Sequence, residues 1–454
     1  MAWPLESPTE PSHVVVIVGG AVAGSEAAVV CADRGARVIV VEQNPRPYGK
    51  IEDGLPRWHV ALRKKEYQRI DANLNRPGVA FLPQTRLGTD VTLGKLVDEL
   101  GVSAVVLANG AWRDRPLAIE GIDAYLGKGL AYQNPFVYWF NHYPERDYRG
   151  PGYEVEDGAI VVGGGLASID VVKILNLELY SRALRSKGID VDLTAMEVKG
   201  IDFVCQKHGV DPASLGVAGC TLYYRRRKQD MPLASADDDL SPEELGKIET
   251  TRAKIMDKVI RKYRVRFEEC SVPVAPLVRQ ERLAGLVFRR TEVAEGRLRE
   301  VPGSDFEVSA PLVVSSIGSV PEPVPEVPRK GELYRWASWE TGALEGFDRV
   351  IGLGNVLTGK GNIKASRQNA RVVAARLMGG AVDGAALDQA SDALHASSRE
   401  QAKDAIGPVL ERNPKLSVDR VRTIANWASG RAKEAGYEFD YARWIANVTP
   451  SDMV

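Results

Sequence analysis

The sequence predicts an α/β fold with two parallel β-sheets, each opened by a glycine-rich turn, and a helical C-terminal region. First, short runs of apolar, β-branched residues alternate with helical stretches, which is typical of parallel sheets covered by helices. Second, two of these runs lead directly into glycine-rich turns, at residues 19–24 and 163–165. Third, the glycine turns stop near residue 383, and the pattern from there on is helical.

Length and composition narrow the class of protein. The 454 residues suggest two to four domains, and 44% hydrophobic with 26% charged residues suits a soluble globular chain. Lys plus Arg (59) balance Asp plus Glu (60), which argues against nucleic-acid binding. The four cysteines are far apart, so we expect no zinc ribbon, iron–sulfur cluster, redox Cys-x-x-Cys pair or disulfide framework.

The N-terminus carries no targeting pattern. Residues 1–12 are proline-rich and acidic, without the basic and apolar regions of a signal peptide. No apolar stretch approaches the ~18 residues that a membrane span needs. We therefore expect a cytoplasmic protein that is not inserted in a membrane.

The first unit is a complete β-α-β motif. Residues 14–18 are an all-apolar strand, residues 25–34 a helix, and residues 37–41 a second strand that ends at Glu42. In the turn between them, Gly19 permits the tight bend, Ala21 stands where backbone approaches a pyrophosphate, and Gly24 allows close helix packing. The helix N-terminus then offers N–H groups to phosphates.

Glu42 indicates which dinucleotide this first unit binds. It follows the second strand, where a carboxylate binds ribose hydroxyls, and its charge repels a 2′-phosphate. FAD or NAD is therefore favoured over NADP. The alternative is an ordinary glycine turn without a ligand.

The second unit begins at residues 159–162 and continues into Gly163, Gly165 and Ser168, where serine replaces the third glycine but still allows helix packing. A helix follows over 167–180, and the next strand, 220–224, ends in four consecutive cations that include Arg225 and Arg226. Guanidinium groups pair with phosphate in a fork, so these residues favour NADPH. The alternative is a solvated charge run.

The remaining elements follow in order. Strands are expected at 103–107 before Gly110, at 312–314, and at 349–353 before Gly354 and Asn355. We interpret residues 176–216 as an insertion and the proline-rich residues 320–329 as a surface loop. In the helical region from 383, the expected packing anchors are Trp427 and Trp444.

Further segments occur in a consistent order over residues 12–380: Pro-Tyr-Gly at 47–49, Gly-Leu-Pro-Arg-Trp-His at 54–59, Phe-Val-Tyr-Trp-Phe-Asn at 136–141, Tyr-Arg-Arg at 224–226 with Met-Pro at 231–232, and Gly-Asn at 354–355 followed by Gly-Lys-Gly-Asn-Ile at 359–363. With the two glycine turns, they make the chain resemble the two-dinucleotide flavoprotein reductases. Within these, it is most similar to adrenodoxin reductase and ferredoxin–NADP reductases of that type, with the glutamate synthase small subunit close behind.

The resemblance implies a glutathione reductase-like arrangement of Rossmann-like domains. The FAD-binding domain would comprise residues 1–118 and 306–382, the NADP-binding domain 119–305, and a helical extension 383–454. It also implies further flavin-side residues, namely Gly49, Gly110, Gly354, Asn355, Gly361 and Ile363. His59, in the matching flavin-side segment, is the candidate catalytic residue for positioning or proton relay; the alternative is a structural histidine.

Three departures from the family pattern matter. Asn355 stands where an aspartate usually bonds the flavin ribityl chain, and it can still donate and accept. Glu52 stands where adrenodoxin-type enzymes tend to carry arginine. The cysteine-rich cluster domain of glutamate synthase small subunits is absent, so electrons would pass to an external acceptor.

The resemblance implies hydride transfer from NADPH to FAD, followed by electron transfer to ferredoxin or another iron–sulfur carrier. The absence of Cys-x-x-Cys excludes the disulfide-reducing branch. Two alternatives remain: a flavin subunit of a larger NAD(P)H-dependent redox enzyme complex, and a flavoprotein scaffold without turnover.

One charged stretch suggests how a partner docks. Residues 252–266 contain seven basic residues and one acid, which could steer an acidic ferredoxin. The alternative is a solvated helix face. We expect the acidic run 237–239 to be a loop.

Overall fold

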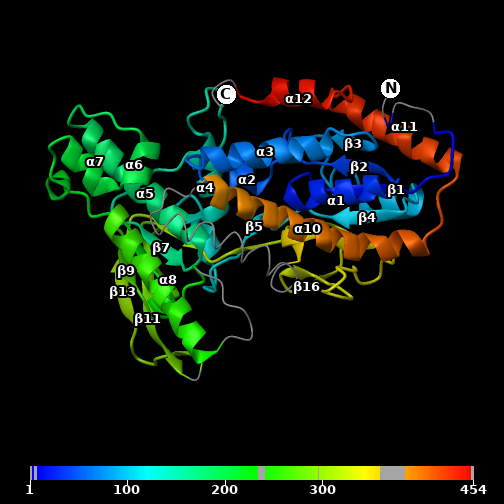
Figure 1. Cartoon of the computed structure of the whole chain (residues 1–454). Helices are drawn as coiled ribbons and strands as arrows, with labels where there is room; N and C mark the ends of the chain where they lie inside the picture. The colour runs from blue at the N-terminus through cyan, green and yellow to red at the C-terminus, as the bar shows by residue number, and fades with distance from the viewer. Residues whose placement is uncertain (1–2, 5–7, 234–240, 295, 358–383, 451–454) are drawn as a thin grey trace.

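The computed structural model describes residues 3–4, 8–233, 241–294, 296–357 and 384–450. Two five-stranded parallel sheets form the centres of two lobes, and the C-terminal helices lie against the first lobe (Figure 1). The predicted α/β fold with two Rossmann-like units is confirmed.

The first sheet has the strand order β18-β4-β1-β2-β3, all parallel. Its central strand is the apolar run Val-Val-Val-Ile-Val, every residue of which is buried, because helices cover both faces. All five strands end at the same edge. Their bounds are β1 (Val14–Val18), β2 (Arg37–Val41), β3 (Val79–Leu82), β4 (Ala104–Leu107) and β18 (Val350–Gly352).

Three helices of this lobe lie between these strands in the chain. Helix α1 (Val22–Asp33) begins at the first glycine turn and ends before Gly35, whose φ of +75° suits a residue without a side chain. The short α2 (Lys50–Asp53) follows β2, and α3 (Val60–Leu74) packs beside α1. The predicted β-α-β unit is thus present with almost the expected bounds.

The second sheet has the order β6-β14-β7-β8-β9. Its strands are β6 (Leu130–Tyr132), β7 (Ile160–Gly163), β8 (Thr221–Tyr223), β9 (Arg266–Glu268) and β14 (Val313–Ser316). The helices of this lobe are α4 (Gln133–His142), α5 (Leu166–Arg185), α6 (Leu193–Lys199), α7 (Ile201–Lys207) and α8 (Pro242–Tyr263). The predicted insertion at 176–216 begins inside α5, because that helix ends nine residues after the predicted start of the insertion. Helices α6 and α7 make up the rest of it.

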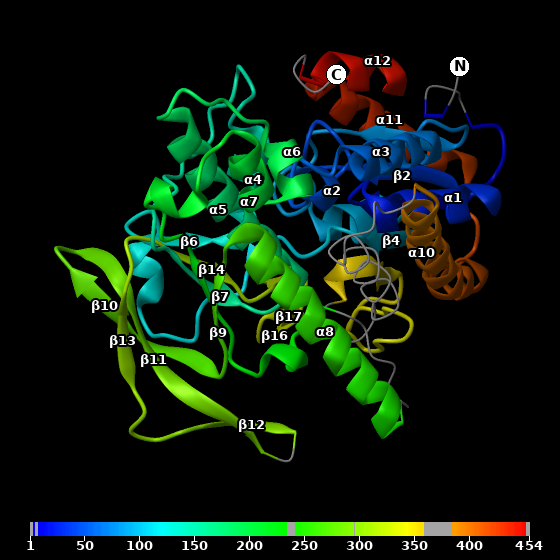
Figure 2. The same ribbon diagram turned by 60° about the vertical axis from the view of Figure 1, so that its left-hand side comes forward.

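An antiparallel sheet extends the second lobe. It consists of β10 (Ser271–Arg279), β11 (Arg282–Ala294), β12 (Arg297–Glu300) and β13 (Phe306–Ser309), and it projects away from both parallel sheets (Figure 2). Phe288 and Tyr223 stack with ring centroids 4.0 Å apart, which joins this sheet to the parallel one.

Within the described residues, two chain crossings connect the lobes. They pair as a short antiparallel ribbon of β5 (Arg113–Asp114) and β15 (Ser319–Val320), with Ser319 opposite Asp114. The return to the first lobe was predicted at residue 306, and that boundary is wrong. Strand β13 pairs with β11 and β14 lies between β6 and β7, so the chain leaves the second lobe only at β15. The remaining domain bounds stay predictions.

The C-terminal region is helical, as expected. Helix α10 (Gly384–Arg412) packs along α1, while α11 (Val418–Glu434) and α12 (Tyr441–Val448) lie over the β3 edge of the first sheet (Figure 1). Trp427 and Trp444 are partly buried against the first core, and the indole N–H of Trp444 donates to the Pro45 carbonyl at 2.8 Å. The extension is therefore part of the first lobe. Among the described helices, none is long and apolar enough to cross a membrane.

Candidate functional site

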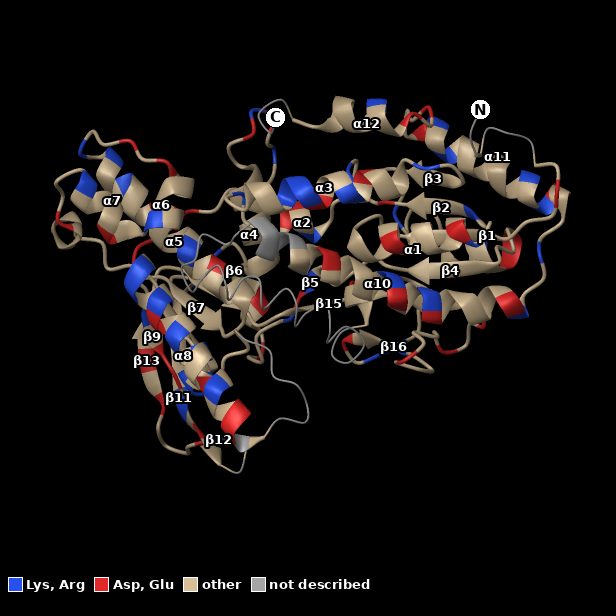
Figure 3. Cartoon of the chain, viewed as in Figure 1, with Lys and Arg blue, Asp and Glu red and all other residues tan. Residues whose placement is uncertain are grey.

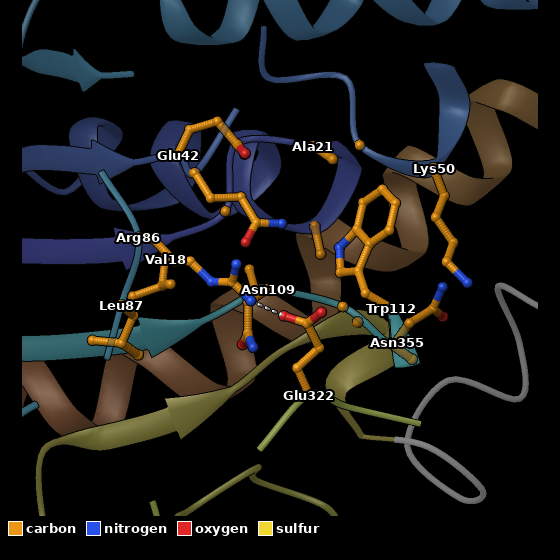
Figure 4. A pocket seen from close by; sticks show the side chains of 18 of the residues that line it. Val18, Ala21, Glu42, Lys50, Arg86, Leu87, Asn109, Trp112, Glu322 and Asn355 are labelled. Atoms are coloured by element: carbon orange, nitrogen blue, oxygen red, sulfur yellow. Dashed lines mark hydrogen bonds and ion pairs between the residues drawn. The ribbon is translucent and has the colours of Figure 1, made fainter. Parts of the chain in front are cut away.

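A cavity of about 530 Å³ lies at the carboxyl edge of the first sheet (Figure 4). The first glycine turn, the end of β2 and the turn after β4 form its floor. Such an edge is where open parallel sheets bind ligands. In Figure 4, Glu42 and Arg86 lie toward one end, and Lys50, Trp112 and Asn355 lie toward the other.

The glycine turn is shaped by close backbone approaches. Gly19 has φ +98°, and a Cβ there would lie 2.6 Å from the Ala108 carbonyl oxygen. A Cβ at Gly24 would lie 1.8 Å from the Gly19 carbonyl oxygen, so both positions require glycine. Ala21 has φ −69°, an ordinary value, so its methyl group fits without backbone strain. No side chain caps α1, which leaves its first N–H groups for a ligand.

Glu42 is fixed at the cavity floor by backbone donors. The Gly20 N–H donates to its Oε2 and the Asn44 N–H to its Oε1, both at 2.9 Å. Burial raises the pKa of Glu42 to about 7, although these two hydrogen bonds oppose the shift. Each carboxylate oxygen keeps a further lone pair, so Glu42 can still accept hydrogen bonds from hydroxyl groups in the cavity.

The flavin-side glycines lie along the same cavity. Gly49, Gly110 and Gly354 have φ of +53°, +68° and +69°, and a Cβ at Gly354 would lie 2.7 Å from the Ala23 Cβ. These three and Asn355 line the cavity together with the first turn. Gly361 and Ile363, also predicted as cofactor-binding residues, lie outside the described residues, as does the acidic run 237–239.

Several cavity residues were not predicted. Asn109 lies two residues after the end of β4, a position that could have marked it; its Oδ1 is buried and accepts no hydrogen bond within the described chain. Arg86 pairs with Glu322 at 2.7 Å across the end nearest Glu42. Pro323 and Pro325, from the predicted surface loop at 320–329, belong to the wall. Lys50 directly follows the recognised Pro-Tyr-Gly segment.

Helix α10 contributes Leu394 and Ser398 to the cavity wall, and no local sequence pattern indicated this. Between them along the helix, His395 is fully buried. Its Nδ1 lies 2.7 Å from Glu26 Oε1 on α1, and its Nε2 lies 2.7 Å from Glu66 Oε2 on α3. We call Glu26, Glu66 and His395 the buried triad.

Three neighbouring side chains, one of them charged, donate hydrogen bonds to the triad. Arg399 donates to Glu26 at 2.7 Å, Asn73 donates to the same carboxylate at 3.1 Å, and the Ser391 hydroxyl donates to Glu66. Hydrogen bonds from His395 and Arg399 lower the pKa of Glu26 to about 2 against the opposing effect of burial. Hydrogen bonds to both carboxylates raise the pKa of His395, although its burial opposes them. The triad therefore holds α10 against α1 and α3.

The second glycine turn connects β7 to α5. A Cβ at Gly163 would lie 2.4 Å from the Ser316 carbonyl oxygen, while Gly165 faces open space. Ser168 is buried and donates to the Gly165 carbonyl at 2.6 Å, which accounts for serine in place of the third glycine. The ring of Tyr224 lies against Gly164, where a Cβ would be 2.1 Å from it.

The four cations after β8 divide into two pairs. Arg227 binds Asp230 through two hydrogen bonds of 3.0 and 2.8 Å, and Lys228 pairs with Asp257 at 2.6 Å. Arg225 is exposed and Arg226 makes a single 3.4 Å hydrogen bond, to the Gly296 carbonyl; neither pairs with a carboxylate of the described residues. Because β7 and β8 are parallel neighbours, this pair lies at the same sheet edge as the turn.

His59 is not among the residues that line the cavity. It precedes α3, is 3% exposed, and its Nε2 lies 4.0 Å from Asp170 Oδ1 on α5, so it sits between the two lobes. Its catalytic role stays a prediction. Glu52, the other departure in this segment, forms a buried ion pair with Arg46 at 2.8 Å. Among the described residues, no cluster of side chains could hold a metal ion.

The fold and site define an α/β protein with two dinucleotide-binding units. Residues 13–177 match the model of the pyridine nucleotide-disulphide oxidoreductase family. The structure is similar to that of a FprA variant from Mycobacterium tuberculosis, with a TM-score of 0.62, 20% identity, and coverage of 93% of this chain and 91% of FprA. FprA in complex with NADPH gives a TM-score of 0.58 at 20% identity, with coverage of 91% and 99%. These likenesses establish the fold.

Curated relatives confirm the resemblance seen in the sequence. A mitochondrial NADPH:adrenodoxin oxidoreductase from Arabidopsis thaliana is 27% identical over 248 residues, which cover 51% of this chain and 48% of that protein. The NADPH-Fe(3+) oxidoreductase subunit beta of Geobacter sulfurreducens is 27% identical over 331 residues, 71% of this chain and 39% of that protein. A glutamate synthase [NADPH] small chain from Mycobacterium tuberculosis is 30% identical over 35% of this chain and 32% of its own length. The matches thus span about half of these relatives or less.

Proposed function

We propose that the chain is an FAD-dependent oxidoreductase that oxidises NADPH and passes electrons to an iron–sulfur carrier such as ferredoxin. The observation that carries the proposal is the cavity of the first unit, which combines the glycine turn, the buried Glu42 and an end that faces the second unit. The name of one relative, the NADPH:adrenodoxin oxidoreductase, supports the same class of reaction.

The cavity residues fit an FAD molecule. The uncapped start of α1 offers N–H groups to a pyrophosphate, and Glu42 offers acceptors to a ribose. Asn109 Oδ1, buried and without a described partner, offers an acceptor farther along the cavity. The backbone of Gly354 lies against α1 beside the glycine turn, so a side chain at this position would fill the space between them.

The chain's own residues bind and orient the reactants. Once bound, a flavin would take a hydride (two electrons and one proton) from NADPH, pass the two electrons singly to two carriers and release the proton to solvent. Arg225 and Arg226 would hold the 2′-phosphate of NADPH at the second sheet. Pro323, Pro325 and helix α10 form part of the wall that separates the first cavity from water. The β5–β15 ribbon sets the distance between the two nucleotide sites.

The absorption spectrum of the purified full chain tests the function. We expect a yellow protein that releases FAD on denaturation and whose visible absorbance is bleached by NADPH without oxygen. A chain that binds no flavin after reconstitution, or releases FMN, would contradict the proposal. A stable flavoprotein that NADPH does not bleach would instead be a scaffold without turnover.

A second candidate is a flavin subunit of a larger complex. It is favoured because two of the relatives, from Geobacter and Mycobacterium, are named as a subunit and a small chain. Size-exclusion chromatography of a native extract distinguishes the two. Elution near the mass of the 49.5 kDa chain supports a stand-alone reductase, and elution in a larger stable assembly supports the subunit.

Glu42→Ala should weaken FAD binding roughly tenfold to a hundredfold, because the loss of a hydrogen bond to a charged group costs about 1.5–3 kcal/mol. Quenching of flavin fluorescence during titration of the apoprotein measures the Kd. The matched control is Glu52→Gln, a buried carboxyl group outside the cavity wall whose pKa burial likewise raises to about 7. Equal losses in both variants would contradict a ribose contact by Glu42.

The basic stretch at 252–266 offers a docking face for an acidic carrier. Lys254, Lys258 and Arg261 share one face of α8 because of their i, i+4 and i+7 spacing, and none of them pairs with a carboxylate of the described residues. Figure 3 shows that Lys and Arg residues recur along α8. The opposite face is buried through Ile255, Met256 and Val259.

Replacing Lys254, Lys258 and Arg261 together by glutamate should raise the KM for a ferredoxin severalfold and leave dye reduction unchanged. The physical reason is that exposed charges steer association and are screened within ~8 Å at physiological ionic strength. Rates measured against salt concentration should therefore fall steeply for the wild type and little for the variant. An unchanged KM would show that this face is only solvated.

A further inference from the structure

Lys50 stands apart from the other cavity residues because it carries a positive charge at the end away from Glu42. It is the first residue of α2, directly after Gly49, and its side chain reaches the end of the cavity where Trp112 and Asn355 lie (Figure 4). Its ammonium nitrogen lies 5.8 Å from the centre of the Trp112 ring. The pyrophosphate and ribose contacts proposed above place the ADP half of FAD at the opposite end.

The ammonium group is held by the second lobe and the crossing ribbon. It donates to Asn134 Oδ1 at 3.1 Å, at the start of α4, and to Ser319 Oγ at 3.0 Å, in β15. Asn134 is itself fixed, because its Nδ2 donates to the Trp112 carbonyl at 2.8 Å and to Ser319 at 3.0 Å. The position of the charge is therefore set by three segments that meet where the lobes join.

Two of the three ammonium hydrogens are accounted for by these contacts, which leaves one for an acceptor in the cavity. No carboxylate of the described residues lies within 4 Å of the Lys50 nitrogen. Burial lowers the pKa of Lys50 to about 8, and the more distant Asp114 opposes this shift. Lys50 is thus charged at neutral pH and has only neutral partners, so its charge is not compensated by a close ion pair.

We propose that Lys50 is the positioning and electrostatic residue of the redox reaction, a cation that donates to the flavin ring and stabilises the negative charge the ring gains on reduction. The proposal rests on the proposed function. A charge beside a flavin ring changes the reduction potential of the ring, because a fixed cation favours the form that carries negative charge. Because Asn134 and Ser319 belong to the joining segments, the same contacts tie this charge to the arrangement of the lobes.

Lys50→Met in the flavin-loaded full chain tests the proposal without turnover. The readouts are the two-electron reduction potential and the affinity for sulfite, whose sulfur lone pair forms a bond to the flavin and leaves a negative charge on the ring. We expect sulfite affinity to fall roughly tenfold to a hundredfold, the effect of a lost charge-assisted hydrogen bond. A tenfold effect on the redox equilibrium corresponds to a potential about 30 mV more negative.

Lys50→Arg keeps the charge and should retain most of both properties, while the control Lys95→Met, at a partly exposed residue that does not line the cavity, should match the wild type. Unchanged potential and sulfite affinity in Lys50→Met would overturn the proposal. So would loss of flavin from both Lys50→Met and Lys50→Gln with wild-type thermal unfolding, because the charge would then serve binding instead. A wild-type chain that binds no flavin overturns the proposed function, whereas a flavin-loaded wild type with unaltered variants overturns only the role of Lys50.

Discussion

Replacing His395 by leucine should lower the free energy of unfolding by about 3–5 kcal/mol, the cost of removing one partner from a buried ion pair. The imidazole lies 2.7 Å from both Glu26 and Glu66 and is fully buried. Without it, two carboxylates would face each other in the core with only part of their hydrogen bonds. Thermal and denaturant unfolding of the purified variant measure the loss.

The pH dependence of this loss follows from the direction of each shift. The pKa of His395 is raised above its usual 6.5, so its contribution is complete below 6.5 and disappears as the pH rises through the folded-state value. The pKa of Glu26 is lowered from 4.5 to about 2, so its contribution is complete above 4.5 and disappears as the pH falls toward 2. The difference between wild type and His395→Leu should therefore be largest between these usual values, near pH 4.5–6.5.

The matched control is His208→Gln, because His208 is exposed. It should unfold within about 0.5 kcal/mol of the wild type, as surface substitutions do. A His395→Leu variant as stable as this control at pH 6 would show that the triad does not hold α10 in place.

The triad also links the C-terminal helix to the cofactor cavity. Leu394 and Ser398, one residue before and three residues after His395, lie on the cavity wall. Gln401, farther along the same helix, accepts a hydrogen bond from the Gly354 N–H at 3.3 Å. A ligand that binds only the folded protein stabilises it, so flavin should leave the stability gap unchanged if the variant keeps its flavin affinity, and should widen the gap if the variant loses that affinity. The C-terminal extension thus completes the site as well as the core.

The sequence predicted those features that depend on local pattern. The apolar run at β1, the turn at Gly19 and the acid at Glu42 lie within thirty residues, and parallel strands bring their carboxyl ends to one edge. That logic placed both sheets, both turns and the C-terminal helices. It also failed for a clear reason at residue 306: a short strand shows that it belongs to a sheet, but not to which of two sheets.

The contacts that complete the site join residues remote in sequence. Lys50 and Ser319 are 269 positions apart, and His395 and Glu26 are 369 apart. No periodicity relates such pairs, and a lone histidine in a helix carries no sign of the carboxylates that will surround it. The pairing within the cation run after β8 was equally hidden. The sequence shows four cations in this run, but only the fold shows which of them Asp230 and Asp257 neutralise.

The four cations after β8 divide into a pair bound to carboxylates and a pair that is not. We therefore expect Arg225 and Arg226 to determine the preference for NADPH over NADH. Arg227 and Lys228 are engaged with Asp230 and Asp257, whereas Arg225 and Arg226 have no described carboxylate partner at the edge where the adenosine ribose should lie. A charge-assisted hydrogen bond contributes roughly 1.5–3 kcal/mol. Arg225→Ala and Arg226→Ala should therefore each lower kcat/KM for NADPH on the order of tenfold to a hundredfold.

NADH lacks the 2′-phosphate, so its kcat/KM should be almost unchanged in both variants, measured with an artificial dye as acceptor. Arg227→Ala is the matched control from the same run: its bidentate pair with Asp230 is a local structural contact, so its loss should affect both nucleotides alike and only slightly. Equal losses for NADPH and NADH in Arg225→Ala and Arg226→Ala would indicate damage to the fold or to pyrophosphate binding. A selective loss in Arg227→Ala alone would mean that Arg227 leaves Asp230 when the nucleotide binds and that the phosphate is held there.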